Sequence, residues 1–440
     1  MNISKYCSAL IIAACTQTAA AEDLLTIYHQ ALDADPQLKS AQVKVEIGAA
    51  QKGQALGQML PQVNASGNWS ANHQTLRGSN NRVSNSNYPG TRYYVSLNQT
   101  LIDFAKFWDW RRASKTEDQY AAEAIEANNQ LMFNVVERYF NELEAEDQLN
   151  FAKSEKQAAQ KQLEQVQKRY AKQVSKITDV YAVEARLDQV IAAEILAETK
   201  RVTAQESLRE LTGVNPNQLS KLREVVDYQE IQGDLQQWVE MAESQNPAIS
   251  AKQIAIQAAE NNVTVQKSKY LPSADLQLNF YDTNTGYQST NLGADTQTEV
   301  AAINVNVPLF SGGVTTHQLF EAQHRLQFSK NDNEAALRSI VKETSDAFLS
   351  ANSNARQIKA SKKALESASK SREAMEQGFQ YGVVTIGDVI KAQQDEFLAK
   401  KEFAQAKYSY IKNRIRFMHA IGSISEENLL EVNNWLEAKN

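Results

Sequence analysis

The chain has 440 residues, a formal net charge of −6 and a mean hydropathy of −0.50. This acidic balance argues against a nucleic-acid-binding face, because such a face needs clustered lysine and arginine. After residue 21 no stretch approaches the roughly 18 consecutive apolar residues that a membrane-spanning helix requires. The sequence therefore excludes a helical membrane protein.

Residues 1–21 have the pattern of a secretory signal peptide. Lys5 supplies the charged region, residues 9–15 the apolar region, and the alanines at 19–21 a cleavage site. Both cysteines of the chain lie inside this segment, so no disulfide is expected in the mature protein. An alternative stays open: the residues up to Cys15 also fit a lipoprotein signal, which would leave a lipidated Cys15. Either interpretation predicts export.

The sequence contains an internal repeat, with two copies of about 200 residues each. Residues 28–61 run in register with residues 239–272, and residues 169–180 match residues 378–389. Each copy is predicted to contain helix, two short strands and then much more helix, an order that is unlike an enzyme core. The predicted divisions are the signal peptide at 1–21, a first repeat at 22–230, a second repeat at 231–430 and a short C-terminal tail at 431–440.

Four segments alternate strictly between apolar and polar residues. In the first, valine, alanine and tryptophan side chains oppose asparagine, glutamine and serine. This alternation is typical of a membrane β-barrel strand, apolar toward lipid and polar toward the lumen. A half-buried sheet in a soluble protein also alternates, so that alternative remains. The four predicted strands are residues 62–71, 92–102, 273–281 and 298–310.

Two further features favour a membrane sheet. The links between paired strands, residues 72–91 and 282–297, are long and polar. Aromatic residues gather after the second strand, where a girdle at the level of the lipid headgroups is expected, although a core cluster would produce the same pattern. The candidate bilayer-interface residues are Phe104, Phe107, Trp108 and Trp110.

Four strands cannot close a barrel by themselves. In lipid an open edge leaves unpaired backbone groups, each costing several kcal/mol, so strands from several chains must complete the barrel. Two chains would supply eight strands, whose interior is filled by side chains, whereas three would supply twelve and leave a passage.

The remaining sequence predicts long helices. Residues 105–172 and 314–377 contain no glycine or proline. Each stretch is followed by a short interruption and a returning helix with heptad-like apolar spacing, which predicts coiled-coil hairpins. The predicted interruptions are residues 173–176 and 381–384, the shorter helices are residues 23–57 and 235–268, and a linker at 219–238 is expected to form a belt.

Several motifs together resemble the TolC family of outer-membrane channel proteins. They are the start at residues 21–38, the Leu-Pro strand entries at 60–62 and 271–273, the PLFSGG corner at 308–313, and the I-x-D-V turns at 177–180 and 386–389. The resemblance covers essentially the whole mature chain. It implies an α+β membrane protein in which a long antiparallel α-helical barrel of coiled-coil hairpins continues an outer-membrane β-barrel, with four strands per chain and twelve in a homotrimer.

The same resemblance implies a location and partners. The barrel would lie in the cell outer membrane among its lipids, and the helical part in the periplasm. The trimer would dock with a periplasmic adaptor (membrane fusion) protein and an inner-membrane transporter to export drugs or type I secreted proteins. The sequence does not name the cargo.

The resemblance also assigns roles to the hairpin tips, which would form the periplasmic entrance. In the family an aspartate, and a second one three residues later, ring the constriction. Here the first is Asp388, but Lys391 takes the second position. The family's closing links join a tyrosine and an arginine to an aspartate of the N-terminal half. Here Asp179 is present, but Phe379 and Val384 stand at the other two positions.

These tip residues also have purely structural interpretations. Thr385-x-x-Asp388 is a capping-box pattern, and Asp179 stands in the first turn of its helix. Lys168 is expected to be solvated or to pair with these aspartates, and Gly382 to end its helix in a left-handed cap. The tip contacts with the adaptor, implied only by the resemblance, are Val174, Gly382 and Val383.

Other classes of protein fit the residues less well. His317, Glu321 and His324 share a helical face, but no third histidine completes a zinc set. No phosphate loop, nucleophile elbow or dinucleotide fingerprint occurs, so neither catalysis nor a cofactor is expected. The remaining alternative is a soluble periplasmic coiled-coil adaptor or structural protein, which would not need two pairs of lipid-facing strands.

Overall fold

The computed structural model describes residues 21–79, 82–284 and 295–437. The predicted signal peptide, apart from Ala21, lies outside the described residues, as does Cys15 with its alternative lipid anchor. Most of the predicted link at 282–297 also lies outside them.

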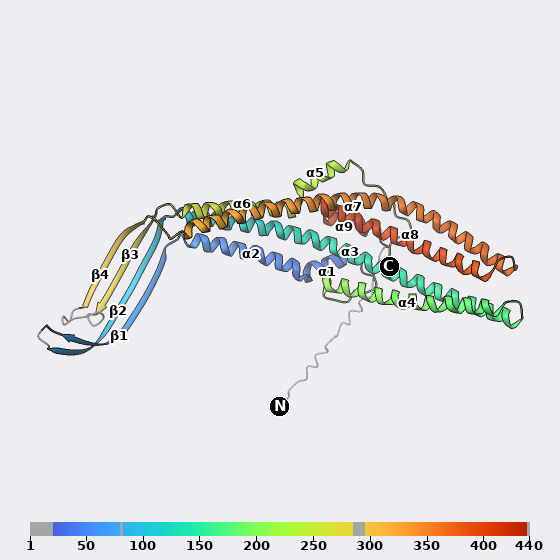
Figure 1. The fold of residues 1–440 in the computed structure, drawn as a ribbon, viewed down its shortest axis with the longest axis horizontal. Helices are drawn as coiled ribbons and strands as arrows, with labels where there is room; N and C mark the ends of the chain where they lie inside the picture. The colour runs from blue at the N-terminus through green and yellow to red at the C-terminus, as the bar shows by residue number, and fades with distance from the viewer. Residues whose placement is uncertain (1–20, 80–81, 285–294, 438–440) are drawn as a thin grey trace, which may run out of the picture. The chain divides into compact units, whose positions relative to one another are not determined.

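Figure 1 shows the helices and strands of the described residues in chain order. They are α1 (Leu24–Ala34), α2 (Pro36–Gly57), β1 (Gln62–Arg77), β2 (Val83–Ile102), α3 (Phe104–Ala171), α4 (Ile177–Thr212), α5 (Leu235–Gln245), α6 (Pro247–Ser268), β3 (Ser273–Asn284), β4 (Asp295–Asn306), α7 (Val314–Gln380), α8 (Ile386–Ala420) and α9 (Glu426–Asn433).

The chain divides into two compact units. Of the described residues, unit 1 comprises 21–38, 128–242 and 340–437, and unit 2 comprises 39–79, 82–127, 243–284 and 295–339. Helices α3 and α7 contribute to both units. Unit 2 contains the strands, and unit 1 contains the hairpins α3–α4 and α7–α8.

The two shorter predicted helices are each broken in the middle. Asp35 and Asn246 have extended ψ angles of 120° and 124°, and each precedes a proline, which disfavours helical backbone in the residue before it. Their side chains cap the helices that follow: Asp35 Oδ1 accepts from the Leu38 N–H (2.7 Å), and Asn246 Oδ1 from the Ala248 N–H (2.8 Å). Both repeats therefore carry the same capped break, which the sequence analysis did not predict.

The strands form one antiparallel sheet in the order β1-β2-β3-β4. The prediction that residues 72–91 form a polar link was wrong, because β1 and β2 stay paired from Gln62↔Asn98 to Arg77↔Val83. These added residues are mostly polar, so they lack the strict alternation that marks a strand. The prediction for the last strand was also wrong at its end: β4 stops at Asn306, before Pro308, which cannot donate to the ladder.

Within unit 2 the helices pack closely beside one another. A Cβ atom added to Gly48 of α2 would lie 3.0 Å from the Glu117 Cα of α3, so a larger residue would push against the backbone of α3. Lys52 Nζ, one turn later on α2, lies 2.8 Å from Glu117 Oε2. On the other pair of helices, Lys252 of α6 lies 2.7 Å from Asp332 of α7.

Within unit 1 the linker between the repeats ties together distant parts of the chain. Glu22 bridges to Leu219, and Leu222 bridges to Leu436. Tyr139 of α3 is fully buried beneath this belt, and its hydroxyl lies 3.1 Å from Glu22 O and 3.0 Å from Ser220 O. Among the described residues, none of the helices combines the length and the apolar character needed to cross a bilayer.

Candidate functional site

One face of the sheet in unit 2 is largely apolar, although the register also places Gln99 and Glu299 on it. The register places Ala65 of β1 beside Val95 of β2, and Val95 beside Phe280 of β3. Most of the large side chains on this face are exposed in the single chain, as side chains that face lipid must be. Further positions on the same face are Val63, Leu97, Leu278, Leu276, Ile303 and Val305.

The opposite face of the sheet is polar. Tyr94 and Tyr281 stack there with ring centroids 4.8 Å apart, and the Tyr94 hydroxyl donates to Asn279 Oδ1 (3.1 Å). The Arg92 guanidinium lies 5.0 Å from the centre of the Tyr281 ring. Asn304 of β4 donates to Gln277 Oε1 of β3 (3.0 Å). The sheet therefore separates an apolar surface from one that water can line.

The tips of the two hairpins in unit 1 share a hydrophobic core. Val166, Val180 and Val183 of the first hairpin are buried with Ile386 and Val389 of the second. Phe379 and Val384 are partly buried and pack against the same core. The tips of the two hairpins in a single chain are thus joined by apolar packing.

The two hairpin turns have the same backbone conformation. Gly382 has φ 76° and Gln173 has φ 61°, so a glutamine occupies the left-handed region at the position equivalent to the glycine. The Val383 N–H donates to Gly378 O, and the Val174 N–H to Arg169 O, at 2.9 Å in both turns. The predicted left-handed cap at Gly382 is present, and the side chains of Val383 and Val174 are 79% and 64% exposed.

The two candidate gate aspartates cap their own helices. Asp388 Oδ2 accepts from the Thr385 N–H (2.9 Å) and the Thr385 hydroxyl (2.6 Å), so the capping box is complete. These hydrogen bonds, with the charge of Lys391, lower the pKa of Asp388. Asp179 accepts from the Lys176 N–H at 3.0 Å.

Lys391 lies near enough to Asp388 for its charge to act on that carboxylate, but the charged candidates of the tip form no direct ion pairs within the described residues. Within the described residues, neither aspartate forms an ion pair with Lys168 or Lys391. The Lys168 side chain is exposed on α3, and Lys391 is exposed on α8. At the tip of a single chain, these lysines therefore remain solvated.

Arg169 is a tip residue that the sequence analysis missed. Its guanidinium carbon lies 4.5 Å from the centre of the Phe379 ring, and Nη1 approaches Phe379 O at 3.4 Å. This contact joins the first hairpin to the second. The aligned turns show that Arg169 and Phe379 are both tip residues, but no local pattern says that they meet across the two hairpins.

Comparison with known proteins identifies the family. Residues 27–214 and 238–423 match the family described as Outer membrane efflux protein, once for each repeat. The chain belongs to this family. Its relatives include Outer membrane protein TolC of Vibrio cholerae, 32% identical over 426 residues that cover 95% of this chain and 94% of the relative.

A further relative and a solved structure also match nearly the whole chain. The alkaline protease secretion protein AprF of Pseudomonas aeruginosa is 25% identical over 94% of this chain and 87% of its own length. The structure of the Campylobacter jejuni CmeC outer membrane channel shares the fold with a TM-score of 0.81 at 18% identity, covering 99% of this chain and 98% of that chain. The efflux protein described here is therefore an outer-membrane transport channel, located in the outer membrane with its helices in the periplasm, and its family is one of channels rather than enzymes.

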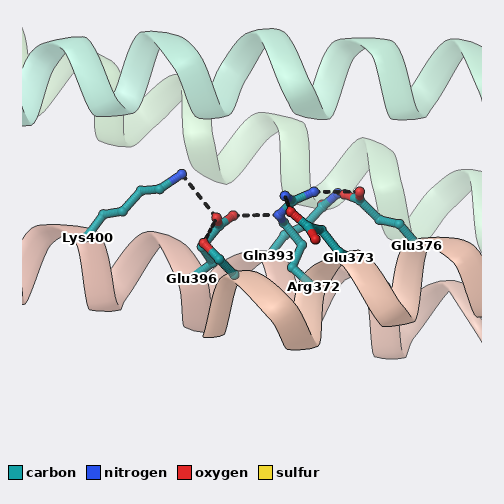
Figure 2. Close-up of polar contacts among 7 residues, drawn as sticks. Arg372, Glu373, Glu376, Gln393, Glu396 and Lys400 are labelled. Carbon is teal, nitrogen blue, oxygen red and sulfur yellow. Dashed lines mark hydrogen bonds and ion pairs between the residues drawn. The ribbon is translucent and has the colours of Figure 1, made fainter. Parts of the chain in front are cut away.

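A network of ion pairs and hydrogen bonds joins α7 to α8 in the second hairpin of this efflux protein (Figure 2). Arg372 of α7 lies 2.7 Å from Glu396 of α8 and 2.6 Å from Glu376. Glu396 also accepts from Lys400 (3.2 Å) and from the Ser369 hydroxyl (2.5 Å). Burial would raise the pKa of Glu396, but these donors and charges outweigh it and lower the pKa.

This network lines one side of a cavity of about 330 Å³ between the two hairpins. On the other side, Arg186 of α4 pairs with Glu155 of α3. Each hairpin therefore holds its own ion pairs at this level. Phe151 and Phe397 complete the lining with apolar surface.

The predicted interface aromatics cluster at the start of α3 in unit 2. The Phe107 ring lies 5.8 Å from that of Trp108 and 6.1 Å from that of Trp110. Phe104 and Phe107 are exposed. At the far end of the apolar face of the sheet, Trp69 and Tyr93 form an edge-to-face pair with centroids 5.8 Å apart. Aromatic residues thus flank the apolar face at both ends.

The alternative metal site receives no support from the geometry. Glu321 pairs with Arg325 at 2.8 Å on the same helix. Among the described residues, no group of three or more histidine, cysteine, aspartate or glutamate side chains could hold a metal ion.

Proposed function

We propose that three copies of this efflux protein share one twelve-stranded barrel and one helical tunnel, and that the trimer exports substrates together with a periplasmic adaptor and an inner-membrane transporter. The observation that carries the proposal is the sheet, which has one apolar face and two open edges, β1 and β4. In a bilayer these edges must pair with other strands, because unpaired backbone groups cost several kcal/mol each. Pairing β4 of one copy with β1 of the next satisfies both edges by rotation.

Disulfide cross-linking tests this arrangement. Ser66→Cys on β1 is combined with Val300→Cys, Ala302→Cys or Asn304→Cys on β4, all on the polar face of the sheet. Oxidation should give covalent trimers in at least one combination, because one register brings the two edges together. The single variant Ser66→Cys is the control and should stay uncross-linked. Monomers in every combination, with a monomeric mass in detergent, would overturn the shared barrel.

The hairpin tips form the periplasmic entrance in this proposal. The contact between the Arg169 guanidinium and the Phe379 ring holds the two hairpin tips of each chain together. It takes the place of the polar closing links that the resemblance implies for the family. Arg169→Gln should then raise the open probability of single channels in planar bilayers, because a cation–π contact contributes about 1 kcal/mol per copy. Lys363→Ala, an exposed charge removed from α7, is the control. Unchanged gating in Arg169→Gln would refute this role.

Asp388 and Asp179 are proposed to line the entrance, with Lys168 nearby. Three Lys391 side chains would partly neutralise three Asp388 carboxylates and so weaken the cation selectivity of the channel. Lys391→Ala should shift the reversal potential in a salt gradient toward cation selectivity. Strong cation selectivity in the wild type, unchanged by Lys391→Ala, contradicts the proposal.

The exposed turns are proposed as the contact with the adaptor. Val174 and Val383 project from the tips, and Gly382 gives the second turn its shape. Family membership decides against the alternative that the chain is itself a soluble adaptor. Both efflux and type I secretion suit a polar, weakly charged lumen. A deletion strain tests them together: loss of a secreted protein from the medium indicates secretion, and increased sensitivity to toxic compounds indicates efflux.

A further inference from the structure

A cavity of about 450 Å³ opens in unit 2 between α3 and α6. Trp108, Arg111 and Lys115 line it from α3, and Gln257 and Glu260 from α6. The two helices are joined beside it by a hydrogen bond from the Asn261 side chain to Arg111 O (3.4 Å). The α3 residues that line it begin at Trp108, six residues after β2 ends at Ile102.

The guanidinium of Arg111 is a positive charge in this cavity that no carboxylate of the cavity neutralises. Within the part of the chain that the structure describes, Lys115 pairs with Asp118 (3.0 Å) and Arg112 with Asp109 (2.8 Å), whereas Arg111 has no carboxylate within ion-pair distance. Its guanidinium instead lies 5.6 Å from the Trp108 ring centre and 5.8 Å from that of Phe107. An arginine held on aromatic faces keeps its N–H groups available for a phosphate.

Glu260 supplies an anion on the other helix. Its side chain is exposed, and no hydrogen bond or ion pair to its carboxylate is formed by the described residues. It does not reach Arg111, since no ion pair joins them. The cavity therefore presents a positive group and a negative group that are separate and solvent-facing, while its other charged pair, Lys115 and Asp118, is internally balanced.

An apolar path leads from this cavity to the sheet. Phe104 and Phe107 are 48% and 40% exposed and lie one turn apart on the same side of α3. Leu101 and Ile102 at the end of β2 are exposed just before them. This path continues into the face of the sheet that carries Val95 and Leu97.

We propose that this cavity binds the headgroup of a phospholipid that carries a primary ammonium, as in phosphatidylethanolamine. The phosphate contacts Arg111, the ammonium contacts Glu260, and the acyl chains follow Phe104 and Phe107 onto the apolar face. A phosphatidylglycerol headgroup would place the same phosphate at Arg111 but would leave the Glu260 carboxylate without a cation. The inference rests on the membrane insertion of the sheet in the proposed function.

Native mass spectrometry of the full-length protein in detergent tests this inference. Delipidated protein is titrated with phosphatidylethanolamine, phosphatidylcholine and phosphatidylglycerol of identical acyl chains. The wild type should bind the ethanolamine lipid about tenfold more tightly than the glycerol lipid, the factor expected from one charge-assisted hydrogen bond. Choline, which has no N–H donor, should bind more weakly than ethanolamine.

Two variants separate the two charges. Arg111→Gln should weaken all three lipids about tenfold, because each has a phosphate. Glu260→Gln should weaken the ethanolamine lipid most, the choline lipid less and the glycerol lipid not at all, and so erase the preference. Arg325→Gln, which removes an exposed charge from α7, is the control and should change neither. A retained oligomer mass in each spectrum shows that the variants are folded.

The outcomes distinguish this inference from the proposed function. Trimers that bind all three lipids equally, or a Glu260→Gln variant that keeps the ethanolamine preference, overturn the headgroup site alone. Tighter binding of the glycerol lipid by the wild type overturns it too, and indicates a plain phosphate site. Monomers in every spectrum overturn the shared barrel.

Discussion

Glu142 of α3 is 6% exposed, and its Oε2 atom has no hydrogen-bond partner among the described residues. Burial raises the pKa of Glu142 to about 7; Arg201 opposes the rise, and Glu146 and Glu22 add to it. The carboxyl group is therefore protonated in the folded protein at pH values where it is ionised in the unfolded chain. Its ordinary pKa is 4.5.

The sign of the pH dependence follows from this raised pKa. The stabilisation from the protonated carboxyl is fully present below pH 4.5 and is lost as the pH rises through 7. Each pKa unit corresponds to about 1.4 kcal/mol, so the group should lower the free energy of unfolding by about 2 to 3 kcal/mol between pH 5 and pH 8. Replacing Glu142 with glutamine, which is neutral at every pH, should remove this slope.

The assay is guanidinium unfolding of the detergent-purified protein, followed by circular dichroism at fixed protein concentration over this pH range. The quantity compared is the change in unfolding free energy with pH, because the glutamine also alters local hydrogen bonding at every pH. Glu164→Gln, at an exposed position on the same helix, is the control and should track the wild type. Parallel curves for the wild type and Glu142→Gln would refute the reasoning.

Three further changes have defined outcomes. Gln173→Gly should stabilise the first hairpin turn by about 1 kcal/mol, because a left-handed glutamine costs about 1 to 2 kcal/mol, and slower amide hydrogen exchange at the turn measures it. Arg372→Leu removes one of the partners of the largely buried Glu396 carboxylate, which keeps Lys400 and Ser369, and should cost about 1 to 3 kcal/mol in thermal unfolding; a loss too small to measure contradicts the role of Arg372 in joining α7 to α8. Gly48→Val should cost about 1 to 3 kcal/mol by forcing α2 from α3, whereas Gly53→Val, with open space around it, should cost less than 1 kcal/mol.

Much of this fold could be predicted from local patterns. The returning helices could be located because Thr385 and Asp388 mark a helix start and because long stretches lack glycine and proline. The sheet could be assigned because alternation places Val95 and Leu97 on one face. The helix breaks at Asp35 and Asn246 were not predicted, but the sequence contains their signal, because an Asp or Asn before proline is typical of a helix cap.

The rest depends on contacts that local sequence does not encode. The extended ends of β1 and β2 are mostly polar and do not alternate strictly, so only their pairing with each other defines them. The meeting of Arg169 with Phe379 joins residues 210 positions apart. The fit of Gln173 into a left-handed turn follows from the tertiary packing of the two hairpin tips rather than from its own preference.

The contacts of the belt in unit 1 can form only after most of the chain has been synthesised and exported. Glu22 N–H donates to Gln218 O and Glu437 N–H to Lys221 O, both at 2.8 Å, so the middle of the chain holds segments from both repeats. These contacts cannot form until the last of their residues has been synthesised and has crossed the inner membrane. The belt contacts therefore form late in folding, and the exported polypeptide must be kept from aggregating until Glu437 has reached the periplasm.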